Sequence, residues 1–188
     1  MWLAIEGIMG AGKTTTAQLL GDQTSLAPLI ERSNQHPLLS AYYSDPTRFA
    51  FETELIFMAL QAQQVMAEDL GGFVSDFAPA KNFVFARTTC SPADLALLED
   101  VDERLWRDLP RPDLTVVLDV PPRVCLKRIT ERGHAYEQNI SVTVLEGLRN
   151  GYVVALAELG NQVELLGLSG DEVPVEVARQ VADLAQLG

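Results

Sequence analysis

Residues 7–14 of the chain read GIMGAGKT, and they come directly after the apolar stretch WLAIE at residues 2–6. They fit the phosphate-loop pattern G-x-x-x-x-G-K-[ST], in which glycines let backbone N–H groups approach phosphates closely. The lysine of this pattern reaches the outer phosphates, and the hydroxyl residue holds Mg²⁺. A strand before the loop and a helix after it, here KTTTAQLL, are the context that the pattern requires.

The stretch therefore predicts a loop that binds a nucleoside triphosphate such as ATP. Lys13 is expected to act on the transferring phosphoryl group, and Thr14 is expected to bind the metal ion. A glycine-rich turn that binds nothing is the alternative, and the strand and helix on either side argue against it. The residues expected to contact the triphosphate are Gly7, Ile8, Met9, Gly10, Ala11, Gly12, Lys13, Thr14 and Thr15.

The chain has 188 residues, of which 47% are hydrophobic, so we expect a single domain over residues 1–188 with a full core. No apolar run is long enough to span a membrane, and the N-terminus lacks the pattern of a signal peptide. Cys90 and Cys125 lack metal-ligand spacing and are expected to be buried thiols of a reducing compartment. These features predict a cytoplasmic protein.

The formal net charge is −12, which argues against a nucleic-acid polymer as partner, because phosphate backbones attract basic surfaces. Small phosphorylated ligands remain compatible with this charge if the few basic residues gather at one site.

Strands and helices alternate along the chain, which predicts an α/β fold with a parallel sheet covered by helices on both faces. Together with the phosphate loop, this is a five-stranded sheet of the P-loop NTPase type, whose ligands bind at the carboxyl ends of the strands. The expected strands are residues 2–6, 27–32, 73–77, 112–120 and 161–168. The expected helices are residues 13–20, a short and a long helix within 36–72 that are separated at Asp45–Pro46, and residues 91–106, 121–133, 136–160 and 173–187.

Charged side chains follow three of these strands. Glu31 ends the second strand and is a candidate general base. The alternative is a charged residue that ends the strand and has no catalytic role. Asp76 follows the third strand and is a candidate second metal-binding residue beside Thr14. After the fourth strand come Arg128 and Arg132, whose i, i+4 spacing places them on one helix face.

Two interpretations fit the basic helix predicted over residues 121–133, which also carries Arg123 and Lys127. It can be a solvated basic face, or a lid over residues 128–137 that closes on a phosphoryl group. Its position in a chain with a phosphate loop favours the lid.

Four segments together resemble the deoxynucleoside kinases, in particular the bacterial deoxyadenosine and deoxyguanosine kinases. The segments are IEGIMGAGKTT, IERSNQHPLLSAYYSDPTRFAFETE, VSDFAPAKNFVFA and LKRITERGHAYEQ, and the resemblance extends over roughly residues 3 to 150. It implies transfer of the γ-phosphoryl group of ATP, with Mg²⁺, to the 5′-hydroxyl of a deoxynucleoside. It also implies a homodimer packed through long helices.

The resemblance implies a role for several residues. Glu31 corresponds to the catalytic base, and Phe85 to the ring that stacks on the nucleobase. Tyr43 and Glu137 correspond to the residues that hold the sugar 3′-hydroxyl. Arg128 and Arg132 correspond to the catalytic lid arginines.

The chain also departs from the family. Animal members carry an acid-Arg-Ser triplet where this chain has SDF, so the arginine after Asp76 is missing, and we expect Arg32 to replace it. Where the family has a third lid arginine, this chain has His134. Where the family has an asparagine before the proline that is Pro37 here, this chain has His36. Where the family has a glutamine that reads the edge of the base, this chain has Glu54.

Glu54 bears on the choice of substrate. It shares one helix face with Phe57 and Gln61, apart from the apolar positions 51, 55, 58 and 62. An ionised carboxylate only accepts hydrogen bonds, and the Watson–Crick edge of guanine offers two adjacent donors. We therefore predict that Glu54 and Gln61 line the substrate pocket and that deoxyguanosine is preferred over deoxyadenosine. A protonated Glu54 would instead accept adenine, and a Glu54 turned to solvent would leave Gln61 to read the base.

Two alternative functions remain open. A thymidylate kinase would also carry such a loop and lid, but that family has an acid in the loop where this chain has Met9. It would also need basic groups for the acceptor phosphate, and only Arg32 and Arg48 lie between Thr14 and Lys81. A nucleotide-binding regulator without turnover is the second alternative, and the presence of a base and two lid arginines argues against it.

Overall fold

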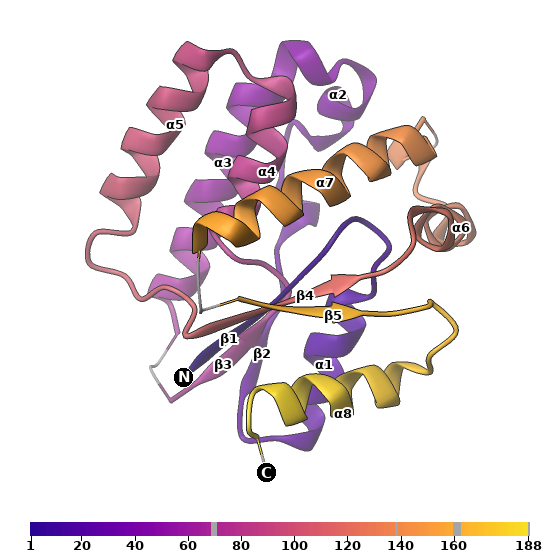
Figure 1. Ribbon diagram of the computed structural model, residues 1–188. Coiled ribbons are helices and arrows are strands. Elements are labelled where there is room, and N and C mark those ends of the chain that lie inside the picture. The colour runs from indigo at the N-terminus through magenta and orange to yellow at the C-terminus, as the bar shows by residue number, and fades with distance from the viewer. Residues whose placement is uncertain (69–70, 138, 160–162, 188) are drawn as a thin grey trace.

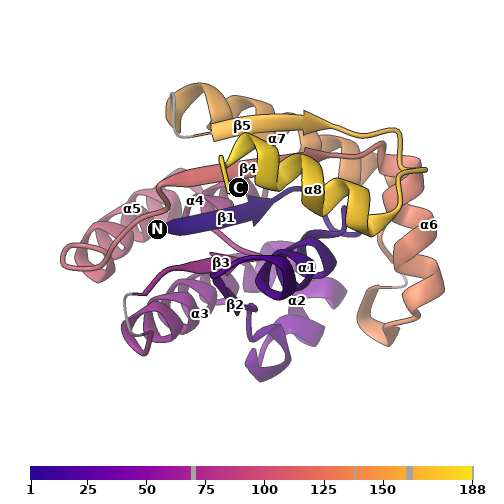
Figure 2. The same cartoon turned by 90° about the horizontal axis from the view of Figure 1, so that it is seen from below.

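A five-stranded, fully parallel sheet forms the centre of the molecule in the computed structural model, which describes residues 1–68, 71–137, 139–159 and 163–187 (Figure 1). The strands lie in the order β2-β3-β1-β4-β5, as the view in Figure 2 makes clear. This confirms the predicted fold class. The strands are β1 (Trp2–Glu6), β2 (Ala27–Leu29), β3 (Phe73–Ser75), β4 (Leu114–Asp119) and β5 (Val163–Gly167).

Helices cover both faces of the sheet. Figure 1 shows α1 and α8 on one side, and α3, α4, α5 and α7 on the other. The helices are α1 (Lys13–Gln23), α2 (Leu39–Ser44), α3 (Pro46–Met66), α4 (Ala80–Thr89), α5 (Pro92–Leu105), α6 (Pro122–Arg132), α7 (Val142–Leu159) and α8 (Pro174–Leu184), with short 3₁₀ turns η1 (Ser33–Gln35) and η2 (Ala135–Glu137). None of the helices within the described ranges is both long and apolar enough to cross a lipid bilayer.

Local sequence explains where the elements begin and end. The five residues of β1 are all buried, as an apolar strand in the middle of a parallel sheet must be. Asp45 caps α3 by accepting a hydrogen bond from the Arg48 N–H, and Pro46 occupies the first turn. Gly133 has a φ of 74° and ends α6 in the left-handed conformation.

The main differences from the predicted boundaries concern β2 and the helix predicted over residues 136–160. β2 ends at Leu29, so Glu31 lies in the loop beyond the strand. The helix predicted over 136–160 divides into η2 and α7, with the connection between them near Ile140. The predicted start of the last strand at residue 161 and the end of the preceding helix at 160 lie outside the described residues.

Two further features were not anticipated. No helix or strand was predicted for residues 80–89, which form α4 and pack against α3 and α7. Both cysteines are free thiols, but only Cys125 is fully buried, because Cys90 at the end of α4 is half-buried.

Gly10 shows why the phosphate loop needs glycine. Its φ is 81°, and a Cβ at this position would lie 2.6 Å from the backbone oxygen of Cys125. A side chain would therefore strain the loop and push it away from the start of α6. Glycine at this position keeps the loop and the lid helix in close contact.

We predict that Gly10→Ala lowers the free energy of unfolding by at least about 1–3 kcal/mol, because alanine meets both an unfavourable φ and a backbone clash. The control is Gly147→Ala, at a helical position of α7 where a Cβ meets nothing within 4 Å. There, alanine is expected to stabilise the helix by about 0.5–1 kcal/mol. Urea denaturation of both variants tests this, and equal stability of the two would contradict it.

Candidate active site

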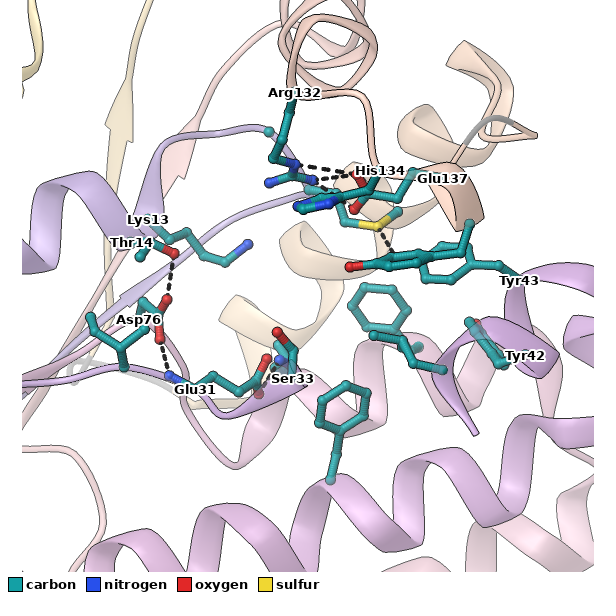
Figure 3. Close-up of a pocket in the computed structure, with 18 of the residues that line it drawn as sticks. Lys13, Thr14, Glu31, Ser33, Tyr42, Tyr43, Asp76, Arg132, His134 and Glu137 are labelled. Carbon is teal, nitrogen blue, oxygen red and sulfur yellow. Dashed lines mark hydrogen bonds and ion pairs between the residues drawn. The ribbon is translucent and has the colours of Figure 1, made fainter. Parts of the chain in front are cut away.

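A cavity of about 500 Å³ lies at the carboxyl-terminal edge of the sheet. It is bounded by the phosphate loop, the residues after β2 and β3, the helices α3 and α4, and the lid formed by the end of α6 and η2. This is the location expected for the ligand of a parallel α/β sheet, and the size suits a nucleoside-sized molecule. Figure 3 shows Lys13, Thr14, Asp76 and Glu31 on one side of the cavity, with Arg132, His134 and Glu137 across from them.

The phosphate loop is tied to the lysine that follows it. Lys13 Nζ donates hydrogen bonds to the carbonyl oxygens of Gly7, at 2.8 Å, and Ile8, at 3.3 Å. Burial lowers the pKa of Lys13, and the Glu6 carboxylate opposes this effect. Gly12, with a φ of 105°, caps the N-terminus of α1, so the positive end of this helix points at the cavity.

Thr14, Asp76 and Glu31 form a chain of hydrogen bonds that Figure 3 draws as dashed lines. The Thr14 hydroxyl donates to Asp76 Oδ2 at 2.5 Å, and the Glu31 N–H donates to Asp76 Oδ1 at 2.7 Å. Asp76 therefore joins the loop after β2 to the first turn of α1. A hydroxyl and a carboxylate side by side are oxygen donors of the kind Mg²⁺ takes, together with water and phosphate oxygens. The predicted pair, Thr14 and Asp76, thus fits a magnesium ion.

Of the two carboxylate oxygens of Glu31, Oε1 is bonded to other side chains. Its Oε1 accepts a hydrogen bond from Gln61 Nε2 at 2.7 Å and forms an ion pair with the Lys81 ammonium. Its Oε2 has no hydrogen-bond partner among the residues that the structure describes. The side chain is only 14% exposed, so the group that holds Oε1 largely decides its orientation.

Two expectations about this region are corrected. Gln61 was expected to line the substrate pocket, and to read the base only if Glu54 turned to solvent. It lies outside the cavity lining, and both ends of its amide are bonded to Glu31 and Asn82. Its tight packing in α3, with no exposed surface, leaves it to position Glu31 instead. Arg32 was expected to supply the missing cation, but its side chain is exposed, and Lys81 is the cation beside Glu31.

The two lid arginines make different contacts. Arg128 donates to the carbonyl oxygens of Gly10 and Ala11, each at 3.3 Å, so it lies against the phosphate loop. Arg132 forms a bidentate ion pair with Glu137, with an Nη2–Oε1 distance of 2.6 Å. Both arginines line the cavity from one end of α6, as the spacing predicted, and one of them is paired with another predicted site residue.

A stack of rings joins the lid to α2. The His134 and Tyr136 rings are 5.4 Å apart and nearly parallel, and Tyr136 in turn stacks on Tyr43 at 5.3 Å. The Tyr43 hydroxyl lies 3.0 Å from the sulfur of Met9 in the phosphate loop. Burial raises the pKa of Tyr43, and the Glu137 carboxylate raises it further, so the phenol stays protonated.

Glu54 lines the cavity and is only 2% exposed. Among the described residues, no hydrogen-bond donor contacts this carboxyl group. Burial raises the pKa of Glu54 to about 8, although the nearby Lys81 lowers it and Glu31 raises it again. The alternative of a Glu54 turned to solvent is therefore excluded, whereas the alternative of a protonated Glu54 is supported at neutral pH.

Most predicted site residues meet in this cavity. Gly7, Ile8 and Ala11 belong to the loop but do not line it. The predicted residues that line it are Met9, Gly10, Gly12, Lys13, Thr14, Thr15, Glu31, Tyr43, Glu54, Asp76, Phe85, Arg128, Arg132 and Glu137.

Lys81, Tyr136 and Glu6 have places in this geometry that were not predicted from the sequence. Lys81 and Tyr136 are among the residues that line the cavity. Lys81 precedes Phe85 by four residues on α4, and this helical spacing was the available signal. Glu6 is fully buried at the end of β1, where it accepts hydrogen bonds from the Ala78 N–H and the Tyr152 hydroxyl. No local pattern distinguishes Glu6 from an ordinary strand-end charge.

Comparison with known proteins agrees with this geometry. The sequence model of a family described as deoxynucleoside kinase matches residues 3–185. A deoxyguanosine kinase of Bacillus subtilis is 29% identical over 181 residues, which cover 90% of this chain and 86% of that protein. A deoxyadenosine kinase of Dictyostelium discoideum is 29% identical over 192 residues, covering 95% of this chain and 77% of that protein.

The fold has a close counterpart among solved structures. The deoxyadenosine kinase from M. mycoides with bound dATP superposes with a TM-score of 0.81 at 18% identity, covering 97% of this chain and 99% of that chain. At this identity the likeness concerns the fold, whereas the family match concerns nearly the whole sequence. The chain belongs to the deoxynucleoside kinase family and is an ATP-dependent phosphotransferase.

Proposed function

We propose that this protein transfers the γ-phosphoryl group of ATP to the 5′-hydroxyl of a purine deoxynucleoside, with deoxyguanosine favoured. The observation that carries the proposal is the Glu31 carboxylate, which shares a cavity with the phosphate loop and has one oxygen without a protein partner among the described residues. A carboxylate so held can accept the proton of an attacking hydroxyl.

In the proposed reaction, the 5′-oxygen attacks the γ-phosphorus while its proton passes to Glu31 Oε2. The bond between the γ-phosphorus and the bridging oxygen breaks, and ADP leaves. Lys13 and the N-terminus of α1 stabilise the phosphate oxygens, and Arg128 and Arg132 stabilise the charge on the transferring group. Mg²⁺, when bound by Thr14 and Asp76, neutralises charge on the phosphates. Tyr43 and Glu137 hold the 3′-hydroxyl, and Phe85 stacks on the base.

Glu54 is proposed to select the base. Guanine presents two donors, N1–H and the 2-amino group, and an ionised carboxylate can accept both. Since the pKa of Glu54 is raised to about 8, ionising it at pH 7 costs about 1.4 kcal/mol. Hydrogen bonds to a charged group are worth about 1.5–3 kcal/mol each, so two of them outweigh this cost and favour deoxyguanosine. Adenine needs one donor and one acceptor, which only the protonated Glu54 offers.

A nucleoside monophosphate is the less suitable acceptor. Its phosphate would require cations besides those that act on the triphosphate, and Arg32 and Arg48 were the candidates. Both side chains are exposed, neither lines the cavity, and Arg48 instead lies over the ring of Phe49. These contacts support a nucleoside acceptor over a thymidylate.

We also propose a homodimer in the cytoplasm, as the family resemblance implies. Exposed Val144 and Val154 on α7, one of the long helices, support packing against a second copy. Two free cysteines support a reducing compartment. Sedimentation velocity of the purified protein tests the dimer, and a monomer at micromolar concentration would contradict it.

Glu31→Gln is predicted to lower kcat by about 10²–10⁴-fold, because the amide keeps the shape of the side chain but cannot take the proton. The measurement is a coupled assay of ADP release with ATP, Mg²⁺ and deoxyguanosine, under conditions where chemistry limits the rate. ATP affinity, measured in parallel, should stay unchanged. A variant that retains nearly full kcat would show that Glu31 is not the base.

Arg128→Ala and Arg132→Ala are each predicted to lower kcat by about 10²–10³-fold, and to lower it more than they raise the KM for the nucleoside. The matched control is Lys127→Ala on the same helix, because this side chain is 76% exposed and pairs only loosely with Glu131 at 3.8 Å. It should change neither constant. An effect on nucleoside KM alone would argue against the lid role.

The preference between deoxyguanosine and deoxyadenosine is predicted to depend on pH. Deoxyguanosine uses the ionised Glu54 and deoxyadenosine the protonated form, so the ratio of their kcat/KM values should rise about tenfold per pH unit. Between pH 6.5 and 8.5 this amounts to about a hundredfold change around the pKa of about 8. Other titrating groups cancel, because both substrates share them.

Glu54→Gln should make this ratio independent of pH and shift it toward deoxyadenosine. Glu52→Gln, an exposed position two residues earlier on α3, is the control and should keep the wild-type slope. A flat ratio in the wild-type enzyme would rule out base selection by Glu54.

A further inference from the structure

Lys81 is a lysine in an unusual environment. Its side chain is only 9% exposed, and its ammonium group lies over the ring of Phe57 at 4.9 Å from the ring centre. A buried lysine is rare in proteins unless an opposite charge compensates for it. Lys81 also lines the cavity, so this charge faces the substrate region.

The compensating charges are carboxylates of the proposed site. Burial lowers the pKa of Lys81, but the adjacent Glu31 and then Glu6 raise it more, and the net shift is upward. The ammonium is therefore charged at neutral pH. Its closest contact is Glu31 Oε1, with which it forms an ion pair.

Gln61 completes the arrangement around Glu31. It donates to the same oxygen as Lys81, at 2.7 Å, and its own amide is fixed by Asn82 through a bond of 2.8 Å. Two donors on Oε1 fix the plane of the carboxylate and leave Oε2 to accept a proton. Gln61 is neutral, so Lys81 is the charged member of this pair of donors.

We propose that Lys81 is a positioning residue for phosphoryl transfer, which holds Glu31 through Oε1 and so keeps Oε2 available to the acceptor hydroxyl. The proposal rests on the proposed function of Glu31 as base. Lys81 keeps its own proton throughout: the proton of the 5′-hydroxyl goes to Oε2, and Glu31 becomes neutral as the new O–P bond forms. Lys81 thus supplies from α4 the cation that the residue after Asp76 does not provide.

Several other charged or titratable groups influence this region. Asp76 follows β3 and bonds the Glu31 N–H, Lys13 begins α1, Glu54 comes from α3, and Tyr152 from α7. Glu54 matters most for the design, because its pKa of about 8 makes its charge vary near neutral pH. Measurements at one fixed pH, with deoxyadenosine as the acceptor, keep its contribution constant.

The test compares kcat and KM for deoxyadenosine in Lys81→Met, Lys81→Gln and Lys81→Arg at one fixed pH. Loss of the ammonium should lower kcat by about 10- to 100-fold in the Met and Gln variants, because Glu31 is no longer held in its productive orientation. The KM for deoxyadenosine should change less than kcat. The Arg variant keeps a charged donor and should recover most of the wild-type kcat.

Arg111→Met is the matched control, because it removes a cation that pairs with the buried Asp102 on α5, away from the cavity. It should leave kcat unchanged. A double variant, Lys81→Met with Glu31→Gln, should lose no more kcat than Glu31→Gln alone, since Lys81 acts through Glu31.

The outcomes separate this proposal from the proposed function. If Glu31→Gln keeps kcat, the base itself is wrong. If Glu31→Gln loses kcat but Lys81→Met and Lys81→Gln keep the wild-type kcat, only the role of Lys81 is overturned. Failure of both Lys81 variants to fold, or equal loss in Lys81→Arg, would assign Lys81 a purely structural role and also overturn the proposal.

Discussion

The carboxylates at the carboxyl-terminal edge of the sheet are the constraint on which the site depends. Parallel strands bring Glu6, Glu31 and Asp76 to the same edge, where burial makes uncompensated negative charge costly. Lys13 and Lys81 supply the opposite charge, and Lys81 is itself buried whereas Lys13 is half-buried. Because each of these charges depends on its neighbours, the loop after β2, the first turn of α1 and the start of α4 are held in one arrangement.

The lid is connected to the rest of the molecule by contacts of another kind. Arg132 and Glu137 pair within the lid itself, and the Tyr136–Tyr43 stack ties the lid to α2. Arg128 contacts the carbonyl oxygens of the phosphate loop. A ligand that occupies both the loop and the pocket would meet all of these groups, so its binding and the position of the lid are coupled.

Neighbouring residues on one face of α3 have different surroundings. Glu54 lies in the cavity without a hydrogen-bond partner among the described residues, whereas Gln61, two turns further on, is fully bonded to Glu31 and Asn82. Phe57 lies between them and packs against the His36 ring at 4.4 Å, while His36 bonds the Thr53 carbonyl oxygen. Helical spacing put these side chains on one face, but their neighbours decide which of them can meet a ligand.

The sequence alone determined the phosphate loop, the parallel α/β fold, and the positions of Glu31, Asp76 and the lid arginines, because these follow from short motifs and local hydrophobic periodicity. Only the tertiary structure decided that Lys81 rather than Arg32 is the cation beside Glu31, and that Gln61 bonds Glu31 and Asn82 instead of lining the cavity. The physical reason is that both outcomes depend on contacts between residues 21 to 50 positions apart. Burial, charge compensation and the raised pKa of Glu54 arise from such contacts, and no local pattern encodes them.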